Sequence, residues 1–559
     1  MRTPFRHKAW NWLPGNGLLA ALALVLIVLV VLPFVMIFAE ATVRDGRFNF
    51  SYALRTIGDA DNLKTIVNTL VLGIAVVVVS TAIALPLAFI MARTQIAHHK
   101  WLDVVFMIPF MTPPYIASMG WILFMQKRGL FQQIFPFTGA WSENFFAFPG
   151  LVFVMSLHIF PFMLTILKNA VVNIGAELEE SAAIFGGGPL YRLRRITLPL
   201  LSGNYAIGAL LVFVKTLSEY GTPATLGRRI GFFVFATDIH RYATVSPINF
   251  GKSASLSCVL MGICLGAWLL QNYTTTRNSY RLVGGKGSRI RTKQLEGPMR
   301  FAAWGVIIIV LFVAIGIPYF AVISTSLIKL RGYGLAFGNF TFQHYINLFT
   351  QNPRGKSAFM TSLTLAVSTS CIAAVLGTMV ASAVHYSSSK TRKIVEAVSL
   401  MPEMLPGIVL IIGIMLFWNR IYKIIPLYNT IGIMILAYVT LFLPFTVQYV
   451  TSSFSQIGNN LVQAGRVFGG SAFYTFRRVT LPLLARGVAA GWMMTFIISF
   501  RELVTASLIA PPNTLVVSTF IMREFEQGSV SIGMAMALIC TLFTVAALML
   551  LNRVVAPQK

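Results

Sequence analysis

Charged side chains are scarce in this chain. Asp, Glu, Lys and Arg make up only 11% of the 559 residues, whereas apolar residues make up 56%. Soluble domains usually contain about 25% charged residues, so the composition excludes a set of soluble domains. Uncharged runs at 17–39 and 66–92 each exceed the roughly 20 residues that a helix needs to cross a bilayer. The composition therefore predicts an all-α integral membrane protein with many spans.

Cysteines are few, and nucleotide-binding motifs are missing. The four cysteines lie in apolar segments without metal-site spacing, which favours small core residues. They are Cys258, Cys264, Cys371 and Cys540. The chain has no G-x-x-x-x-G-K-[ST] phosphate loop, and the nearest sequence, at 284–288, lacks the spacing and a preceding strand. No catalytic constellation is visible, so we do not expect an enzyme, and the sequence leaves metal binding open.

Acidic residues are outnumbered by basic ones, 17 against 44, which gives a formal net charge of +27. No nucleic-acid-binding signature accompanies this charge. An excess of Lys and Arg on cytoplasmic loops is the expectation for a membrane protein. Basic residues occur before the first span and after the last one, at 2, 6, 8, 553 and 559. We therefore expect a lipid bilayer as partner, no nucleic acid, and both termini in the cytoplasm.

One polar, basic stretch occurs twice. Residues 179–200 read EESAAIFGGGPLYRLRRITLPL, and residues 461–483 read LVQAGRVFGGSAFYTFRRVTLPL. The two segments align without a gap at an offset of 283. Each copy predicts a helix, a glycine turn, a short second helix and a stop. Gly186 suits a left-handed cap of the first helix, and Pro189 suits the first turn of the second.

The repeat extends over the whole chain. Pro109, Pro113 and Gly120 align with Pro402, Pro406 and Gly413 at an offset of 293. Prolines at such positions kink a span and release backbone carbonyls. The sequence predicts a first membrane domain at 1–271, a basic cytoplasmic linker at 272–300 and a second membrane domain at 301–559. About 12 transmembrane helices are expected, in two tandem six-helix repeats: 17–39, 66–92, 104–125, 146–167, 200–218, 254–270, 301–327, 358–384, 397–418, 430–450, 485–500 and 530–551.

Three carboxylates are candidates for the transport path, because charges in apolar spans are costly. Glu219 and Glu502 end the fifth and eleventh spans at matched positions, and Glu403 lies beside Pro402 and Pro406. Glu219 and Glu502 could form a gate or line a path, or they could be interfacial carboxylates paired with basic neighbours (Lys215 or Arg501). For Glu403 the path is favoured, because the prolines open the backbone there. Pro109, Pro113, Pro402 and Pro406 are candidates with it.

The duplicated stretch resembles the EAA loop of ABC importer permeases, through E-x-A-A-x-x-G followed by a distant L-P. In that family the loop forms a coupling helix that docks in a groove of a cytoplasmic ATPase. The resemblance implies ATPase docking by Glu180, Ala182, Ala183, Gly186, Gly187, Arg194 and Pro199, and by Gln463, Gly465, Gly469, Gly470, Arg477 and Pro482. Gln463 replaces the family's glutamate, which puts the acidic contact in the second copy in doubt.

The same resemblance implies the partners and the location. They are an ABC ATPase dimer that binds ATP and Mg, a periplasmic solute-binding protein, and the bacterial inner membrane. Residues 219–227, EYGTPATLG, and 280–287, YRLVGGKG, resemble the ferric-iron permease subfamily, so ferric iron is the expected solute. Thiamine, phosphonate or another small solute is the alternative within the same class. An ion-driven secondary transporter is the alternative from another class, although it would leave the two loops without a purpose.

Overall fold

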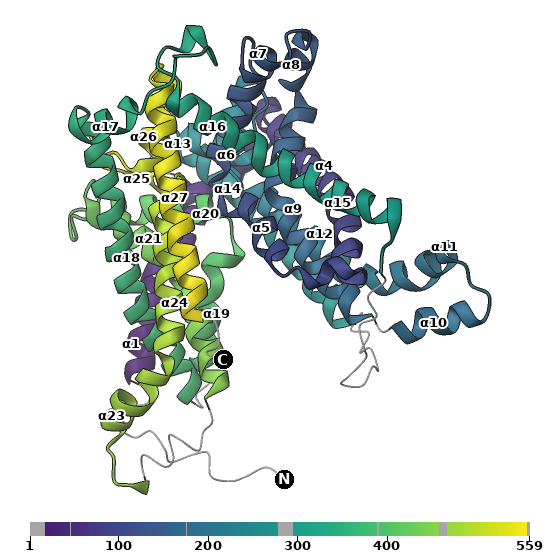
Figure 1. Ribbon diagram of the computed structural model, residues 1–559. Coiled ribbons are helices and arrows are strands. Elements are labelled where there is room, and N and C mark those ends of the chain that lie inside the picture. The colour runs from purple at the N-terminus through teal and green to yellow at the C-terminus, as the bar shows by residue number, and fades with distance from the viewer. Residues whose placement is uncertain are drawn as a thin grey trace. The chain divides into compact units, whose positions relative to one another are not determined.

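The computed structural model describes residues 17–44, 46–174, 176–277, 294–387, 391–457 and 467–555. This part of the chain is almost entirely helical, as expected (Figure 1). Its one small sheet is a hairpin, in which β1 (Val43–Arg44) pairs antiparallel with β2 (Arg47–Phe48). The all-α prediction is therefore confirmed.

Within the described residues, ten helices are long and apolar enough to cross a membrane, and two bent pairs raise the number to as many as 12. The ten helices are Gly17–Thr42, Ala60–Arg93, Phe148–Asn173, Pro189–Ser218, Phe250–Tyr273, Gly297–Leu327, Pro353–Tyr386, Ile431–Gln456, Phe476–Phe500 and Val530–Leu551. The bent pairs are α5 (Trp101–Met111) with α6 (Pro114–Met125), and α19 (Thr391–Met404) with α20 (Gly407–Arg420). These pairs bend by 84° and 112° at the predicted proline positions.

The chain forms two compact units. One contains 58–238 and 262–341, and the other contains the chain to residue 57, 239–261 and 342–559. The first span of each repeat therefore belongs to the unit built mainly from the other repeat. In one unit α16 (Ile317–Leu327) packs on α6; in the other, α2 (Leu32–Thr42) packs on α20.

Two matched glycines allow this close packing. A Cβ on Gly120 would lie 2.6 Å from the carbonyl oxygen of Pro318, and a Cβ on Gly413 would lie 2.5 Å from that of Pro33.

The division at 1–271, 272–300 and 301–559 describes the sequence repeat and stays a prediction, since the compact units follow packing instead. Residues 278–293 of the predicted linker lie outside the described part, while α14 (Phe250–Arg277) and α15 (Gly297–Leu311) extend into its two ends.

Each unit has the same three-helix core. In one, α4 (Ala60–Arg93), α9 (Phe148–Asn173) and α12 (Leu198–Ser218) pack together. In the other, the core is α18 (Pro353–Tyr386), α21 (Ile431–Gln456) and α24 (Leu481–Phe500). The third helix of each core directly follows a duplicated loop, so the core fixes the position of that loop.

Candidate docking loops and transport path

The first duplicated loop begins with α10 (Ala176–Ile184). Gly186 ends this helix with a φ of +82°, the left-handed conformation that the sequence predicts. Its amide donates to the Ala183 carbonyl at 3.0 Å, and the Gly187 amide donates to the Ala182 carbonyl at 2.7 Å. This pair of bonds is the Schellman cap of a helix C-terminus. The cap fixes the angle at which the chain leaves α10.

The second copy repeats this geometry where it is described. Gly469 also has a φ of +82°. Gly470 leads into α23 (Ala472–Thr475), as Gly187 leads into α11 (Pro189–Arg192). Gln463 and Gly465 lie outside the described residues, so their contacts stay predictions.

The predicted stop after the second helix is wrong. α11 continues through a π-helical turn, Leu193–Thr197, into α12, so that one helix runs from Pro189 to Ser218. In the second copy α23 continues through Phe476–Thr480 into α24. Pro199 and Pro482 each lie at the start of the following α-helix, where a proline's missing N–H is tolerated. The extra residue in each π turn shifts the hydrogen-bond register just before the proline, so the helix does not break.

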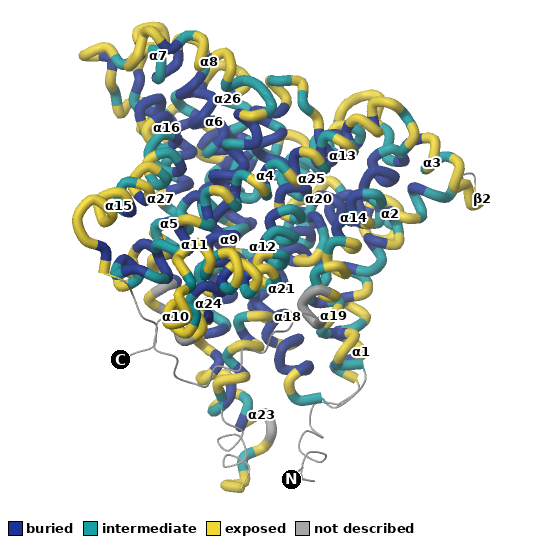
Figure 2. The backbone as a smooth tube through the Cα atoms, turned by 90° about the vertical axis from the view of Figure 1, so that its right-hand side faces the viewer, coloured by how far each residue is buried: buried dark blue, intermediate teal, exposed yellow. Residues whose placement is uncertain are grey.

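Both loops expose large apolar side chains. Ile184 and Phe185 are 84% and 90% exposed, and Val467 and Phe468 are 84% and 89% exposed. Glu180 is also exposed on α10, and Figure 2 shows α10 and α11 as largely exposed. Arg194, Arg477 and the two prolines lie on exposed positions of the following helices. Exposed apolar pairs of this kind are candidates for a protein–protein contact, which stays a prediction.

Glu219 and Glu502 have the same structural role in the two halves. The Thr222 amide donates to both carboxylate oxygens of Glu219, at 3.1 Å each. The Val504 and Thr505 amides donate to Glu502 at 2.9 and 2.8 Å, at the start of α25 (Val504–Ile509). A carboxylate at a helix N-terminus satisfies amides that have no partner within the helix. Both glutamates are half-buried helix caps, and their predicted role in a path or gate stays a prediction.

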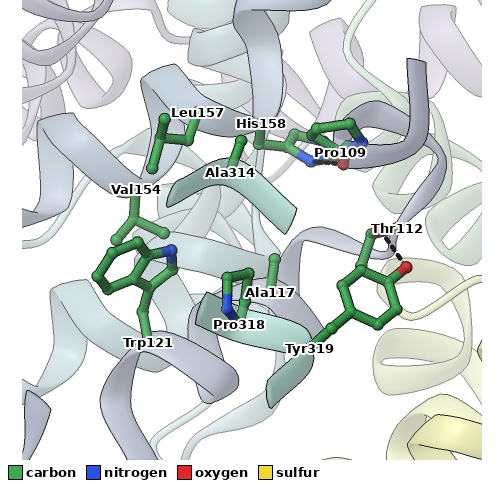
Figure 3. Close-up of a pocket in the computed structure, with 10 residues that line it drawn as sticks. All are labelled: Pro109, Thr112, Ala117, Trp121, Val154, Leu157, His158, Ala314, Pro318 and Tyr319. Carbon is green, nitrogen blue, oxygen red and sulfur yellow. Dashed lines mark hydrogen bonds between the residues drawn. The ribbon is translucent and has the colours of Figure 1, made fainter. Parts of the chain in front are cut away.

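The first proline break lies between α5 and α6. Figure 3 shows the residues that line a pocket beside it, which are mostly apolar but include Thr112, His158 and Tyr319. The Pro109 carbonyl has no helical donor four residues later, because that position is Pro113. His158 from α9 supplies the donor instead, with Nδ1 2.8 Å from the Pro109 oxygen. Beside the break, the Thr112 hydroxyl lies 2.7 Å from the hydroxyl of Tyr319 on α16. Side chains from two other helices, α9 and α16, therefore hold the break.

The second proline break has different polar partners. Pro402 and Pro406 are buried, as are Pro109 and Pro113. Glu403 is exposed and accepts a hydrogen bond from the Gln448 side chain. The sequence analysis singled out Glu403 but missed His158. A histidine in an apolar span, 49 residues after Pro109, was the available signal, although sequence spacing alone does not show that the two residues meet.

In Figure 1, α7 (Leu130–Ile134) and α8 (Gly139–Phe145) lie at the end of the 58–238 and 262–341 unit opposite α10 and α11. The connecting segments at this end are basic. Exposed basic side chains lie on its connecting segments: Lys127, Arg128, Arg228, Arg229, Lys329 and Arg331. The Arg331 guanidinium lies 3.5 Å from the Gln126 side-chain oxygen. Part of the Arg229 side chain is covered by its neighbours, and this partial burial, followed by the charge of Arg331, lowers the pKa of Arg229. This surface is suited to an acidic partner.

No group of three or more His, Cys, Asp or Glu side chains that could hold a metal ion occurs among the residues that the structure describes. Among the described residues, the duplicated loops and the proline breaks are thus the two distinctive features. Both are features of position and packing, and neither is a catalytic arrangement.

Comparison with known proteins identifies the family. The family model for the binding-protein-dependent transport system inner membrane component matches twice, at 84–280 and 373–559. The chain is 23% identical over 557 residues to the ferric transport system permease protein FbpB of Actinobacillus pleuropneumoniae. This alignment covers 97% of the chain and 78% of that protein. It is also 23% identical over 539 residues to the Fe(3+)-transport system permease protein FbpB 2 of Haemophilus influenzae, in an alignment that covers 94% of the chain and 97% of that protein.

A shorter relative matches about half of the chain. The putative 2-aminoethylphosphonate transport system permease protein PhnV of Salmonella typhi is 26% identical over 257 residues, which are 46% of this chain and 96% of that protein. The double match confirms the predicted resemblance to fused two-domain importer permeases. This chain belongs to the family of binding-protein-dependent transport system inner membrane components.

Proposed function

We propose that this chain is the membrane permease subunit of an ATP-driven importer, with a separate ATPase dimer bound to its two duplicated loops. ATP and Mg bind to that ATPase. The observation that carries the proposal is the matched pair of loops, each with a glycine at φ +82° and an exposed apolar pair beside it. An isolated surface aromatic would need no explanation, but the same apolar pair at the same cap in two distant segments does.

The continuous helices after the loops suit a coupling role. One helix connects the first loop to Ser218, and Glu219 lies directly after it. Displacement of a docked loop would therefore move the whole fifth span, because packed helices move largely as rigid bodies. ATP binding biases such a cycle only by its different affinity for the two states.

A periplasmic binding protein would deliver the solute to the opposite face. The exposed basic side chains around Arg229 and Arg331 support an acidic docking partner there. This arrangement places the docking loops, the linker and both termini in the cytoplasm of a bacterium with an inner membrane. It also accounts for the excess of basic residues without nucleic acid.

Ferric iron is the proposed solute. The support is the sequence of residues 219–227 together with relatives whose names specify ferric transport and which match nearly the whole chain. A phosphonate is the second candidate, supported by a relative named for 2-aminoethylphosphonate transport that matches about half of the chain. Uptake of ⁵⁵Fe by cells that carry the complete system, measured with and without the chain, distinguishes the two. Phosphonate uptake without iron uptake would refute the ferric assignment.

Replacement of the exposed aromatics tests the docking site. Phe185→Asp and Phe468→Asp should each reduce co-purification of the ATPase, because a charge would enter an apolar contact. Phe137→Asp is the matched control, since Phe137 is 85% exposed at the other end of its unit. Equal ATPase recovery from all three variants would contradict docking at these loops.

A further inference from the structure

A short helix lies between the first and second spans of each repeat. In the first repeat it is α3 (Phe50–Gly58), and in the second it is α17 (Gln343–Thr350). Residues at i, i+4 and i+7 lie on one face of a helix. Each repeat has three apolar residues with this spacing, at an offset of 292: Phe50, Leu54 and Ile57, then Phe342, Ile346 and Phe349. The two repeats therefore share an apolar helix face outside their spans.

This shared face is exposed in both helices. Phe50 and Leu54 are 63% and 67% exposed. Phe342, at the start of α17, is 72% exposed, and Ile346 is 54% exposed. Single exposed apolar residues need no explanation, whereas groups of them mark a surface that contacts a partner protein or a membrane. The position of the two helices in the fold decides between these occupants.

α3 is held at the end of one span and the beginning of another (Figure 2). The Asn49 amide donates to the carbonyl of Thr42, the last residue of the first span, at 2.6 Å. The Tyr52 hydroxyl donates to the side-chain oxygen of Asn249 at 3.0 Å, and Asn249 directly precedes the span in α14. Because α3 is tied to the ends of two spans, it lies at the boundary between the bilayer and water.

α17 has the same relation to the span that follows it. Its buried Leu348 packs against Gly355 of α18, where a Cβ would lie 2.7 Å from the Leu348 side chain. The Asn352 amide donates to the Asn347 carbonyl at 2.9 Å, and the Asn352 side chain accepts from the Gly355 amide at the start of α18. Thr56, the residue of α3 that matches Leu348, is also buried. Each helix therefore packs on the protein with one side and exposes its apolar side.

The lipid-facing surface of the first span continues onto α3. Val35 and Phe38 are exposed in α2, inside the span, so they contact lipid. α3 begins where this span ends and adds Phe50 and Leu54 to the exposed apolar residues. Arg55 is exposed beside them, and α3 contains no acidic residue. A basic side chain beside an apolar face suits the headgroups of anionic lipids, which favours the bilayer surface as the occupant.

We propose that α3 and α17 are interfacial helices whose apolar faces insert into the outer leaflet of the bilayer, to a depth of about 5–10 Å. The inference goes beyond the proposed function, which enters only in assigning this leaflet to the periplasmic side. Insertion fixes the depth at which the first span of each repeat is connected to the second. The competing occupant is a periplasmic protein docked on the same face, and it gives a different experimental result.

Spin labels on single introduced cysteines test the insertion, in a full-length chain whose four native cysteines are replaced by alanine. Leu54→Cys and Ile346→Cys place the label on the apolar faces. Arg55→Cys and Gln343→Cys are the matched controls, at exposed polar positions of the same helices. In vesicles of phosphatidylethanolamine and phosphatidylglycerol, collisions with a water-soluble nickel reagent should be about threefold or more less frequent at the apolar positions than at the controls, and collisions with oxygen more frequent.

The outcomes separate the bilayer from a protein partner. Equal nickel accessibility at Leu54 and Arg55, or at Ile346 and Gln343, would overturn the insertion of that helix. Protection that appears only after the binding protein of the system is added would also overturn it and assign the face to that protein. Ile57→Cys repeats the measurement on the same face if Leu54→Cys does not insert. The measurement needs neither ATP nor solute, so a failure of the proposed function would leave its result unchanged.

Discussion

Replacement of Gly186 by valine tests whether the docking loop acts as a rigid lever. The backbone φ of +82° lies in the left-handed region, and a Cβ at this position would meet nothing within 4 Å. The cost of a side chain is therefore conformational and not a clash. An L-residue pays about 1–2 kcal/mol in this conformation, and a β-branched residue lies at the upper end. An energy of this size lowers the population of the cap about 5- to 30-fold.

The expected result is loss of coupling without loss of the protein. Gly186→Val should insert normally, because the loop lies outside the packed spans, and ATP hydrolysis should continue. Solute transported per ATP hydrolysed, measured in proteoliposomes with the ATPase and the binding protein, should fall. Gly469→Val should behave in the same way, because Gly469 has the same φ.

Two neighbouring substitutions are the controls for this prediction. Gly186→Asn should retain most of the coupling, because asparagine tolerates the left-handed conformation. Gly188→Thr should also be tolerated, because the backbone there is extended, with φ −64° and ψ 166°, and the residue is the N-cap of α11. A stably inserted Gly186→Val protein with wild-type coupling would refute the lever.

Three further predictions concern packing, capping and topology. Gly413→Ala should lower the free energy of unfolding of the detergent-purified protein by about 1–3 kcal/mol in a thermal melting assay, because its Cβ would lie 2.5 Å from the Pro33 carbonyl oxygen. Gly262→Ala should leave the free energy of unfolding unchanged, because a Cβ there would meet nothing within 4 Å. Glu219→Gln and Glu502→Gln should each lower the free energy of unfolding by about 0.5–2 kcal/mol in the same melting assay, because each change weakens a helix cap. Unchanged melting of both variants would contradict the capping role. A cysteine introduced at Ser288 should resist a membrane-impermeant thiol reagent added to sealed cells, because the basic linker should face the cytoplasm, and rapid labelling from outside would reverse the proposed topology.

The features that depend on a few neighbouring residues could be predicted from the sequence. Hydropathy located the spans, and the double glycine run located the left-handed caps, since few other residues tolerate φ near +82°. The bends at Pro109–Pro113 and Pro402–Pro406 also followed directly from proline geometry. Each of these features is determined by a few consecutive residues.

Features that depend on distant residues were not predictable in this way. The helix was expected to stop near Pro199, but the π turn before it absorbs the register change, and α11 continues into α12. Hydropathy also cannot say which span packs against Gly120, because every candidate partner is apolar. For the same reason, His158 could be seen as an unusual residue in a span, but its carbonyl partner could not be named.

The exchange of first spans has a consequence for how the protein is made. α6 must pack against α16, which is synthesised nearly 200 residues later. The first half therefore emerges from the ribosome with one side of its broken span uncovered, and it reaches its final form only after the linker and the next helix have been inserted. The newly made spans are vulnerable to misassembly during this interval. A chain cut within the linker would yield two incomplete halves, each retaining the helix that completes the other.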